Sequence, residues 1–303
     1  MVRRATFRWK IMLCLALLVG SAVPAASVAQ TEIEKAIAGA YRLDTNRSRD
    51  IYRHPRETLM FFGLAPHLHV VEVWPGGGWY TEILAPVLRE NGKLYAAHYF
   101  VDESTPPNTR NARAAYLEKL AKHPAIYDKV VVTALHVPKH TQIAPKASVD
   151  LVLTFRNVHN WSAQGNDEAA FKAFYDALKP GGVLGVVEHR AQEGASMQEM
   201  KRTGYITETY VIRLAERAGL RLVARSEINA NARDTRDHAH GVWSLPPSLS
   251  GGAQDRDKYL AIGESDRMTL KFVKAPAKPT GAKPEGDKGK AEPKADKPAP
   301  KAE

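Results

Sequence analysis

A glycine-rich segment has the residue types expected of a ligand-binding turn. It follows a β-branched apolar run and contains Glu72, Trp74, Pro75, Gly76, Gly77 and Gly78. Consecutive glycines let the backbone approach a ligand closely and adopt positive φ. A helix that starts after such a turn offers unpaired N–H groups and the positive end of its dipole to an anionic group. We therefore expect a ligand here, with Glu72 either contacting a cation or hydroxyl of the ligand or bracing the turn.

The spacing of the glycines argues against two common nucleotide sites. A dinucleotide-binding turn has the spacing Gly-x-Gly-x-x-Gly, and Thr81 stands where its third glycine belongs. A phosphate-binding P-loop would continue as Gly-Lys-Ser/Thr, which is absent from this segment. A nucleoside that carries a carboxylate fits the turn better than a pyrophosphate does.

A second chemically capable segment is Arg156-Asn157-Val158-His159-Asn160-Trp161, which follows the fourth predicted strand. Ligands of open parallel sheets bind at the carboxyl ends of the strands. We predict His159 as the catalytic base or substrate-orienting group, because imidazole exchanges protons near neutral pH. Asn157 is the second predicted catalytic residue, because its amide can donate and accept hydrogen bonds and so suits contacts with the substrate. The alternative is that His159 is a loop residue that caps the next helix.

Two other polar clusters carry weaker signals. Glu188-His189-Arg190 ends the fifth predicted strand and could bind substrate or form an ion pair beneath a lid. Asp234, Asp237, His238 and His240 have side chains that can coordinate zinc. Residues two apart point the same way only on a strand, however, and solvated loops have the same composition. We predict no metal site.

Alternating strands and helices must position these segments. Short β-branched apolar runs predict strands, and longer amphipathic or capped segments predict helices. Strands are expected at 70–74, 93–97, 129–134, 150–155, 182–188, 220–226 and 268–273, and helices at 31–42, 55–62, 80–88, 108–122, 167–178 and 207–218. Strands that are apolar on both faces imply a sheet covered on both sides. The fold class is therefore α/β, with a Rossmann-like, seven-stranded, mostly parallel sheet, helices on both faces, and an inserted lid at 229–266 before the last strand.

The two ends of the 303-residue chain differ in composition from its body. Residues 1–29 combine a basic start, a short apolar run and the small-x-small pattern Ser27-Val28-Ala29, which together predict a secretory signal peptide. Residues 275–303, rich in Lys, Pro and Ala, predict a disordered tail. The folded domain is thus expected at 30–274, in a periplasmic or secreted protein without stable membrane insertion after cleavage. Arg3-Arg4 weakly resembles a twin-arginine signal, so the export route stays open.

Composition limits the chemistry further. The single cysteine, Cys14, lies in the predicted signal peptide, which excludes cysteine nucleophiles and cysteine-ligated metals from the mature chain. The formal net charge of +10 is modest for this length, and no basic run alternates with aromatic residues. Nucleic acid is therefore not an expected partner, whereas a small-molecule substrate is.

The glycine segment also resembles that of a known family. Residues 71–81 resemble the first motif of class I S-adenosylmethionine-dependent methyltransferases, and Leu178-Lys179-Pro180-Gly181-Gly182 resembles the turn before their fifth strand. Residues 74–81 together with 156–161 resemble a narrower group, the predicted periplasmic methyltransferases. The resemblance covers about 50–274. It implies S-adenosylmethionine as cofactor, bound by Glu72, Trp74, Pro75, Gly76, Gly77, Gly78 and Asp102.

The chain departs from the family pattern at three places. Trp74 replaces the usual first glycine. The acid that usually ends the second strand and binds ribose is missing, and Asp102 can serve only if that strand runs beyond Ala97. Leu135 and His136 stand where an acid or amide often contacts adenine.

These departures leave two hypotheses of different classes. The first is a methyltransferase that acts on a small molecule or envelope component. The alternative is a non-catalytic envelope ligand-binding protein that keeps the fold. A nicotinamide-dependent oxidoreductase is disfavoured by Thr81 and by the Lys-Pro-Gly-Gly turn.

Overall fold

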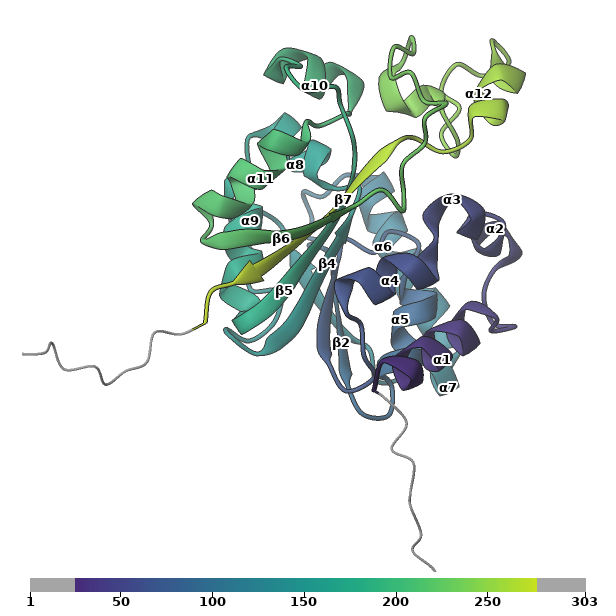
Figure 1. Ribbon diagram of the computed structural model, residues 1–303. Coiled ribbons are helices and arrows are strands. Elements are labelled where there is room, and N and C mark those ends of the chain that lie inside the picture. Colours follow the sequence, from purple (N-terminus) through teal and green to yellow (C-terminus); the bar gives the residue numbers. More distant parts are fainter. Residues whose placement is uncertain (1–24, 277–303) are drawn as a thin grey trace, which may run out of the picture.

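A single seven-stranded sheet forms the centre of the protein in the computed structural model, which describes residues 25–276 (Figure 1). Its strands are β1 (His69–Val73), β2 (Lys93–Tyr99), β3 (Val131–Leu135), β4 (Val149–Phe155), β5 (Leu178–His189), β6 (Leu220–Ser226) and β7 (Arg267–Lys274). They lie in the order β3-β2-β1-β4-β5-β7-β6. β1 to β5 pair in parallel, and β7 runs antiparallel between β5 and β6. The predicted fold class is confirmed.

Helices cover both faces of this sheet, as the sequence predicts. One face carries α8 (Val158–Gln164), α9 (Asp167–Ala177) and α11 (Glu208–Arg217), and the other carries α1 (Ala25–Ile37), α4 (Pro55–Phe62), α5 (Thr81–Leu88) and α7 (Pro124–Tyr127) (Figure 1). Successive strand residues point to opposite faces, so Val70 packs in one hydrophobic cluster and Val71 in the other. The remaining helices are α2 (Asp44–Arg47), α3 (Asp50–Arg53), α6 (Pro107–Lys122), α10 (Met197–Thr203), η1 (Gly241–Ser244) and α12 (Arg256–Ile262).

The sheet topology creates a crevice for ligands. From β1 the chain moves outward through β2 and β3, then returns to place β4 on the other side of β1. The connections that follow β1 and β4 therefore diverge at the carboxyl ends of these two strands, which is where open α/β sheets bind ligands. The glycine turn follows β1 and the His159 segment follows β4, so both predicted segments reach this crevice.

Three expectations from the sequence need correction or refinement. The first helix covers Ala25–Ile37 instead of 31–42, because Gly39 interrupts the pattern soon after its end. The sequence pattern predicts no helix at 158–164, yet α8 begins there, so His159 lies in the first turn of a helix and not in a loop. The insertion between β6 and β7 contains η1 and α12, and both lie beyond the end of β5 and the start of β7 (Figure 1).

The chain ends are only partly covered. Residues 1–24 of the predicted signal peptide and residues 277–303 of the predicted tail lie outside the described residues. Within 25–276, none of the helices combines the length and the apolar character needed to cross a membrane.

Candidate functional site

The glycine turn after β1 adopts the left-handed backbone that its composition predicts. Gly76 has φ +56°, and a side chain added there would meet open space, so backbone conformation and not crowding favours glycine at this position. Trp74 has φ +47°, although it carries a large side chain. The tryptophan thus has a left-handed backbone, which glycine adopts more readily than any other residue. Left-handed backbone costs a non-glycine residue about 1–2 kcal/mol, which contacts of the indole must offset.

A buried carboxyl, that of Glu72, and a half-buried amine, that of Lys119, hold this turn from below. The Glu72 carboxylate accepts a hydrogen bond of 2.6 Å from the Thr81 hydroxyl at the start of α5, and burial raises the pKa of Glu72 to about 7. Lys119 Nζ on α6 donates to the carbonyl oxygen of Gly77 (2.9 Å) and to Glu82 (2.6 Å). Of the two roles expected for Glu72, bracing the turn is the one that its contacts support.

A cavity of about 520 Å³ opens beside the turn, over the carboxyl ends of β1, β2 and β3. We call it the loop cavity. Its walls include Trp74, Tyr99, Phe100, Asp102, Leu135, His136 and Asn160. The indole Nε1 of Trp74 donates to the carbonyl oxygen of Leu135 (3.1 Å), and its ring lies 5.1 Å from the ring of Tyr99. The Trp74 side chain therefore bridges the ends of β1 and β3 and forms one aromatic wall.

Asp102 reaches this cavity because β2 is longer than predicted. The strand continues to Tyr99, two residues beyond the expected end at Ala97, and Asp102 follows in an exposed turn. Its Oδ1 accepts hydrogen bonds from Ser104 and Thr105, which lower the pKa of the carboxyl. Its Oδ2 has no hydrogen-bond partner among the described residues. A carboxylate oxygen is thus available at the cavity to accept hydrogen bonds from a ligand.

His98 occupies the buried end of β2 and was not predicted as part of the site. Burial lowers its pKa to about 4, so the ring is neutral at physiological pH. Its Nδ1 accepts from the backbone N–H of Tyr99 (2.7 Å), which leaves the proton on Nε2 to be donated to the carbonyl oxygen of Gly76 (3.2 Å). The histidine fixes the glycine turn to β2. Its position near the end of a predicted strand is the only sequence signal for this role.

His159, the predicted catalytic residue, is held by the end of β5. Its Nδ1 lies 2.9 Å from Oε1 of Glu188. The same carboxylate accepts from the backbone N–H groups of Val158 (2.6 Å) and His189 (2.8 Å). A carboxylate with three or more donors around it acts as an acceptor, which assigns a proton to Nδ1 of His159. Its Nε2 has no hydrogen-bond partner among the described residues.

Asn157, the other predicted catalytic residue, faces the protein interior. Its Nδ2 donates to the carbonyl oxygen of Val73 (3.0 Å) and to Thr154 Oγ1 (3.3 Å), and the side chain is buried. It borders neither the loop cavity nor the cavity at His159. The contacts tie the end of β4 to the end of β1 and so align the two segments that carry the site.

His159 borders a second cavity, of about 280 Å³, that the insertion covers with Trp243 and Pro246. We call it the arginine cavity, after Arg49, Arg53, Arg156 and Arg267. Arg156 begins a segment that was selected from the sequence, although without a role for this residue, and the other three were not selected. The sequence signal for the first two is their spacing of four residues, which places Arg49, just before α3, on the same side as Arg53, the last residue of that helix. Asn160 borders the loop cavity, so adjacent residues of α8 face the two cavities.

The Glu188-His189-Arg190 triplet divides its roles. Glu188 holds His159, as described above, and His189 borders the arginine cavity. Burial lowers the pKa of His189 well below its usual value, and His159 lowers it further. Arg190 pairs with Asp266 (3.0 Å) and Glu227 (2.7 Å), residues that flank the insertion. Of the two roles expected for the triplet, Arg190 forms the ion pair. Substrate binding stays a prediction, for which His189 is the residue placed at a cavity.

The polar cluster in the insertion is a hydrogen-bond network. The Asp234 carboxylate accepts from His238 (2.8 Å), from the Tyr205 hydroxyl (3.0 Å) and from the backbone of Asp266 (2.8 Å). His240 is exposed and does not join it. Among the described residues, the one group that could hold a metal ion is His159, Glu188 and His189, whose ligand atoms lie within 4.8 Å of one another. The cluster at 234–240 anchors the insertion to β7.

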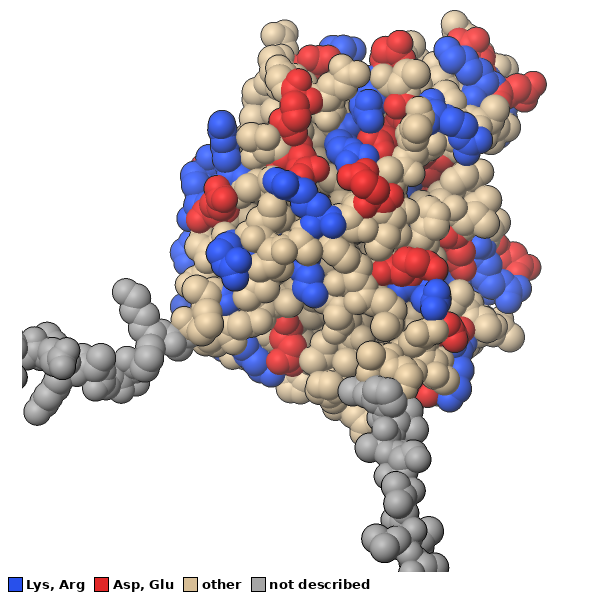
Figure 2. Space-filling model, viewed as in Figure 1, with Lys and Arg blue, Asp and Glu red and all other residues tan. Residues whose placement is uncertain are grey.

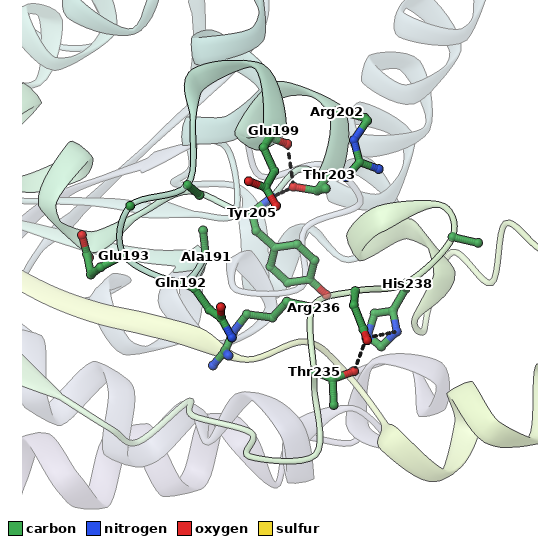
Figure 3. Close-up of a pocket in the computed structure, with 14 residues that line it drawn as sticks. Ala191, Gln192, Glu193, Glu199, Arg202, Thr203, Tyr205, Thr235, Arg236 and His238 are labelled. Atoms are coloured by element: carbon green, nitrogen blue, oxygen red, sulfur yellow. Dashed lines mark hydrogen bonds and ion pairs between the residues drawn. The ribbon is translucent and has the colours of Figure 1, made fainter.

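A larger hollow, of about 700 Å³, lies away from the crevice. It separates the segment that leads into α10 from the insertion, and Tyr205 extends between them toward the stretch that carries Arg236 and His238 (Figure 3). The charged groups of Arg236 and Asp237 have partners, in Asp266 and Thr235 respectively. Size alone thus does not mark this hollow as the site, since the glycine turn and His159 lie elsewhere.

Basic side chains are not concentrated on the face shown in Figure 2. Lys and Arg alternate there with Asp and Glu. The basic residues on this face therefore do not form a continuous band.

Comparisons with known proteins agree on the architecture. No family model and no curated protein matches the chain. Among solved structures, a SAM-dependent methyltransferase from Aquifex aeolicus is 18% identical, with 80% of this chain and 97% of that chain covered and a TM-score of 0.49. The [4+2]-cyclase SpnF is 15% identical, with 84% and 97% covered and a TM-score of 0.50. At this level of identity, the similarity to SpnF shows a shared fold and leaves the reaction open.

Proposed function

We propose that this protein is an exported S-adenosylmethionine-dependent methyltransferase that acts on a small molecule or an envelope component. One observation carries the proposal: the adjacent residues His159 and Asn160 border two different cavities. One cavity lies beside the glycine turn and the other lies beside a histidine–carboxylate pair. A group-transfer enzyme needs such an arrangement, with donor and acceptor held next to each other.

The residues of the loop cavity fit the nucleoside part of S-adenosylmethionine. Trp74, Tyr99 and Phe100 give aromatic surface for a base, and the free Oδ2 of Asp102 accepts hydrogen bonds from ribose hydroxyls. The volume, about 520 Å³, lies within the usual range for small-molecule sites. Of the glycine segment, Trp74 borders the cavity, and the glycines that follow it lead to the start of α5, whose N–H groups suit the carboxylate end of the ligand. When bound there, the cofactor supplies a methyl group on a positively charged sulfur.

The arginine cavity provides the acceptor side. Glu188 fixes the orientation of His159 and keeps its Nδ1 protonated, so Nε2 can take a proton from an acceptor as the acceptor attacks. Trp243 packs edge-on near this ring, with 6.2 Å between centroids. The insertion thereby covers His159 and limits the access of water.

The test is calorimetric titration of the purified full chain with S-adenosylmethionine and, separately, with S-adenosylhomocysteine. We expect micromolar binding that Gly76→Val abolishes and His159→Ala retains. Gly181→Val is the matched control, because Gly181 also has positive φ (+81°) and open surroundings but lies at the opposite end of the sheet. Absence of binding in a folded protein, or equal losses in both glycine variants, would contradict the proposal.

The alternative is a non-catalytic envelope ligand-binding protein, and Trp74 favours it. The indole fills space beside the glycine turn and is fixed by its bond to Leu135. If it excludes the methionine part of the cofactor, Trp74→Gly creates S-adenosylhomocysteine binding that the natural chain lacks. The same titrations therefore separate the two functions.

A further inference from the structure

The arginine cavity contains more positive than negative charge. Four guanidinium groups line it, together with one carboxylate, that of Glu264. Arg53, Arg267 and Glu264 are almost fully buried. Buried charges are normally paired, because removal from water disfavours an isolated ion strongly.

The carboxylate of Glu264 forms ion pairs with three of the four arginines. It accepts from Arg49 (2.6 Å) and Arg53 (3.3 Å) and is also bonded to Arg267. The electrostatic influence of these cations, Arg267 first, lowers its pKa against the effect of burial. The carboxylate is therefore ionised at physiological pH. It also interacts electrostatically with the fourth arginine, but one negative charge cannot balance four positive charges.

Arg156 is that fourth cation. Its side chain has no hydrogen bond or ion pair with any described residue, and its Nη1 is buried without a partner. Burial, and next the positive charge of Arg267, lower its pKa to about 10, so it stays charged at neutral pH. The backbone of Arg156 is left-handed (φ +60°), and it directly follows β4. A charged donor group is thus held at the cavity with nothing to receive its hydrogen bonds.

A metal ion is a poorer occupant than an anion. His159, Glu188 and His189 could offer ligand atoms, but Glu188 already accepts several hydrogen bonds. The four guanidinium groups would also repel a cation. Guanidinium groups are instead well suited to phosphate and carboxylate, which they can bind through paired N–H donors.

We propose that the arginine cavity binds the oxyanion group, phosphate or carboxylate, of a small molecule, and that Arg156 is its principal ligand. His159 borders the same cavity, so a nucleophile attached to that molecule lies within reach of its Nε2. The assignment of this molecule as the methyl acceptor rests on the proposed function, whereas anion binding itself does not.

The experiment is calorimetric titration of the full chain with inorganic phosphate and, separately, with malonate. We expect binding of at least one anion, and the stronger of the two identifies the headgroup. Arg156→Gln should weaken it at least tenfold, and Arg156→Lys less. Arg213→Gln, which removes the same charge from an exposed position on α11, should leave it unchanged.

Thermal unfolding gives a readout that a purely structural role for Arg156 would not produce. Without anion, Arg156→Gln should unfold at a higher temperature than the natural chain, because it removes an unbalanced charge. Added anion should raise the unfolding temperature of the natural chain but not that of the variant.

Two results would overturn the inference: no binding of either anion, or binding that Arg156→Gln leaves unchanged. Titration with S-adenosylmethionine separates this failure from failure of the proposed function. If the anions bind but S-adenosylmethionine does not, the anion site is supported and the methyltransferase proposal is contradicted. If S-adenosylmethionine binds but neither anion does, the methyltransferase proposal is supported and the anion site is contradicted.

Discussion

Nδ1 of His159 and Oε1 of Glu188 lie 2.9 Å apart, and this contact joins the first turn of α8 to the end of β5. The same carboxylate accepts the backbone N–H of Val158, so Glu188 both caps the helix and orients the imidazole. One side chain thus fixes where α8 starts and which nitrogen of His159 is free.

Glu188→Gln should therefore alter stability and the His159 tautomer together. An amide accepts fewer hydrogen bonds and carries no charge, so we expect the free energy of unfolding to fall by about 2–3 kcal/mol. Nitrogen NMR should find the His159 proton on Nδ1 in the natural chain and partly on Nε2 in the variant. Glu216→Gln, at an exposed position on α11, is the control. A proton on Nε2 in the natural chain would contradict the assignment.

Substitutions of Trp74 should reveal the cost of its backbone conformation. Trp74→Ala and Trp74→Gly both lose the indole contacts with Tyr99 and Trp161 and the bond to Leu135. Only glycine adopts φ +47° without penalty, so Trp74→Gly should be more stable than Trp74→Ala by about 1 kcal/mol. Chemical denaturation of the two variants measures the difference. Equal stabilities would show that the left-handed conformation is not strained.

The central strands could be predicted from the sequence because they are buried on both faces. Such a strand is a short apolar run, and β4, expected at 150–155, is observed at Val149–Phe155. The edge strand β6 has alternating burial and was predicted with its observed bounds, Leu220–Ser226. Helix α8 was missed because the acceptor at its start comes from Glu188, far along the chain. Local sequence patterns cannot predict a contact between residues so far apart in the chain.

The sequence could predict those parts of the candidate site that lie within a single continuous segment. The glycine turn and His159 each follow a strand, so topology brings both to the crevice. The arginine cavity combines Arg49 and Arg53 from the region of α3, Arg156 after β4 and Arg267 at the start of β7. These residues become neighbours only when β7 pairs with β5, and no sequence motif predicts that pairing.

Export can be tested by the start of the mature chain. We expect cleavage after Ala29, so intact-mass analysis of the protein from its own cell envelope should find Gln30 at the N-terminus. Helix α1 spans this bond, and Ala29 is buried, so cleavage must precede packing of the first turn. Ala29→Arg should block processing because signal peptidase requires a small residue there. A chain that begins at Met1 would contradict the prediction.

The buried carboxyl of Glu72 should make stability depend on pH. Its pKa is about 7 in the folded protein, against an ordinary value of 4.5. Between these values the folded state keeps a proton that the unfolded state has released. The free energy of unfolding therefore falls as pH rises through this window, by up to about 3 kcal/mol from this group.

Glu72→Gln removes that dependence, because the amide resembles the protonated carboxyl and can still bond to Thr81. We expect the variant and the natural chain to have similar stability near pH 4.5 and the variant to be more stable at pH 8. Urea denaturation across this range measures the difference, in which the contributions of other titrating groups cancel. Glu216→Gln should follow the natural chain at every pH. Parallel curves for Glu72→Gln and the natural chain would mean that Glu72 is ionised in the fold, and that Lys119 and Thr81 outweigh its burial.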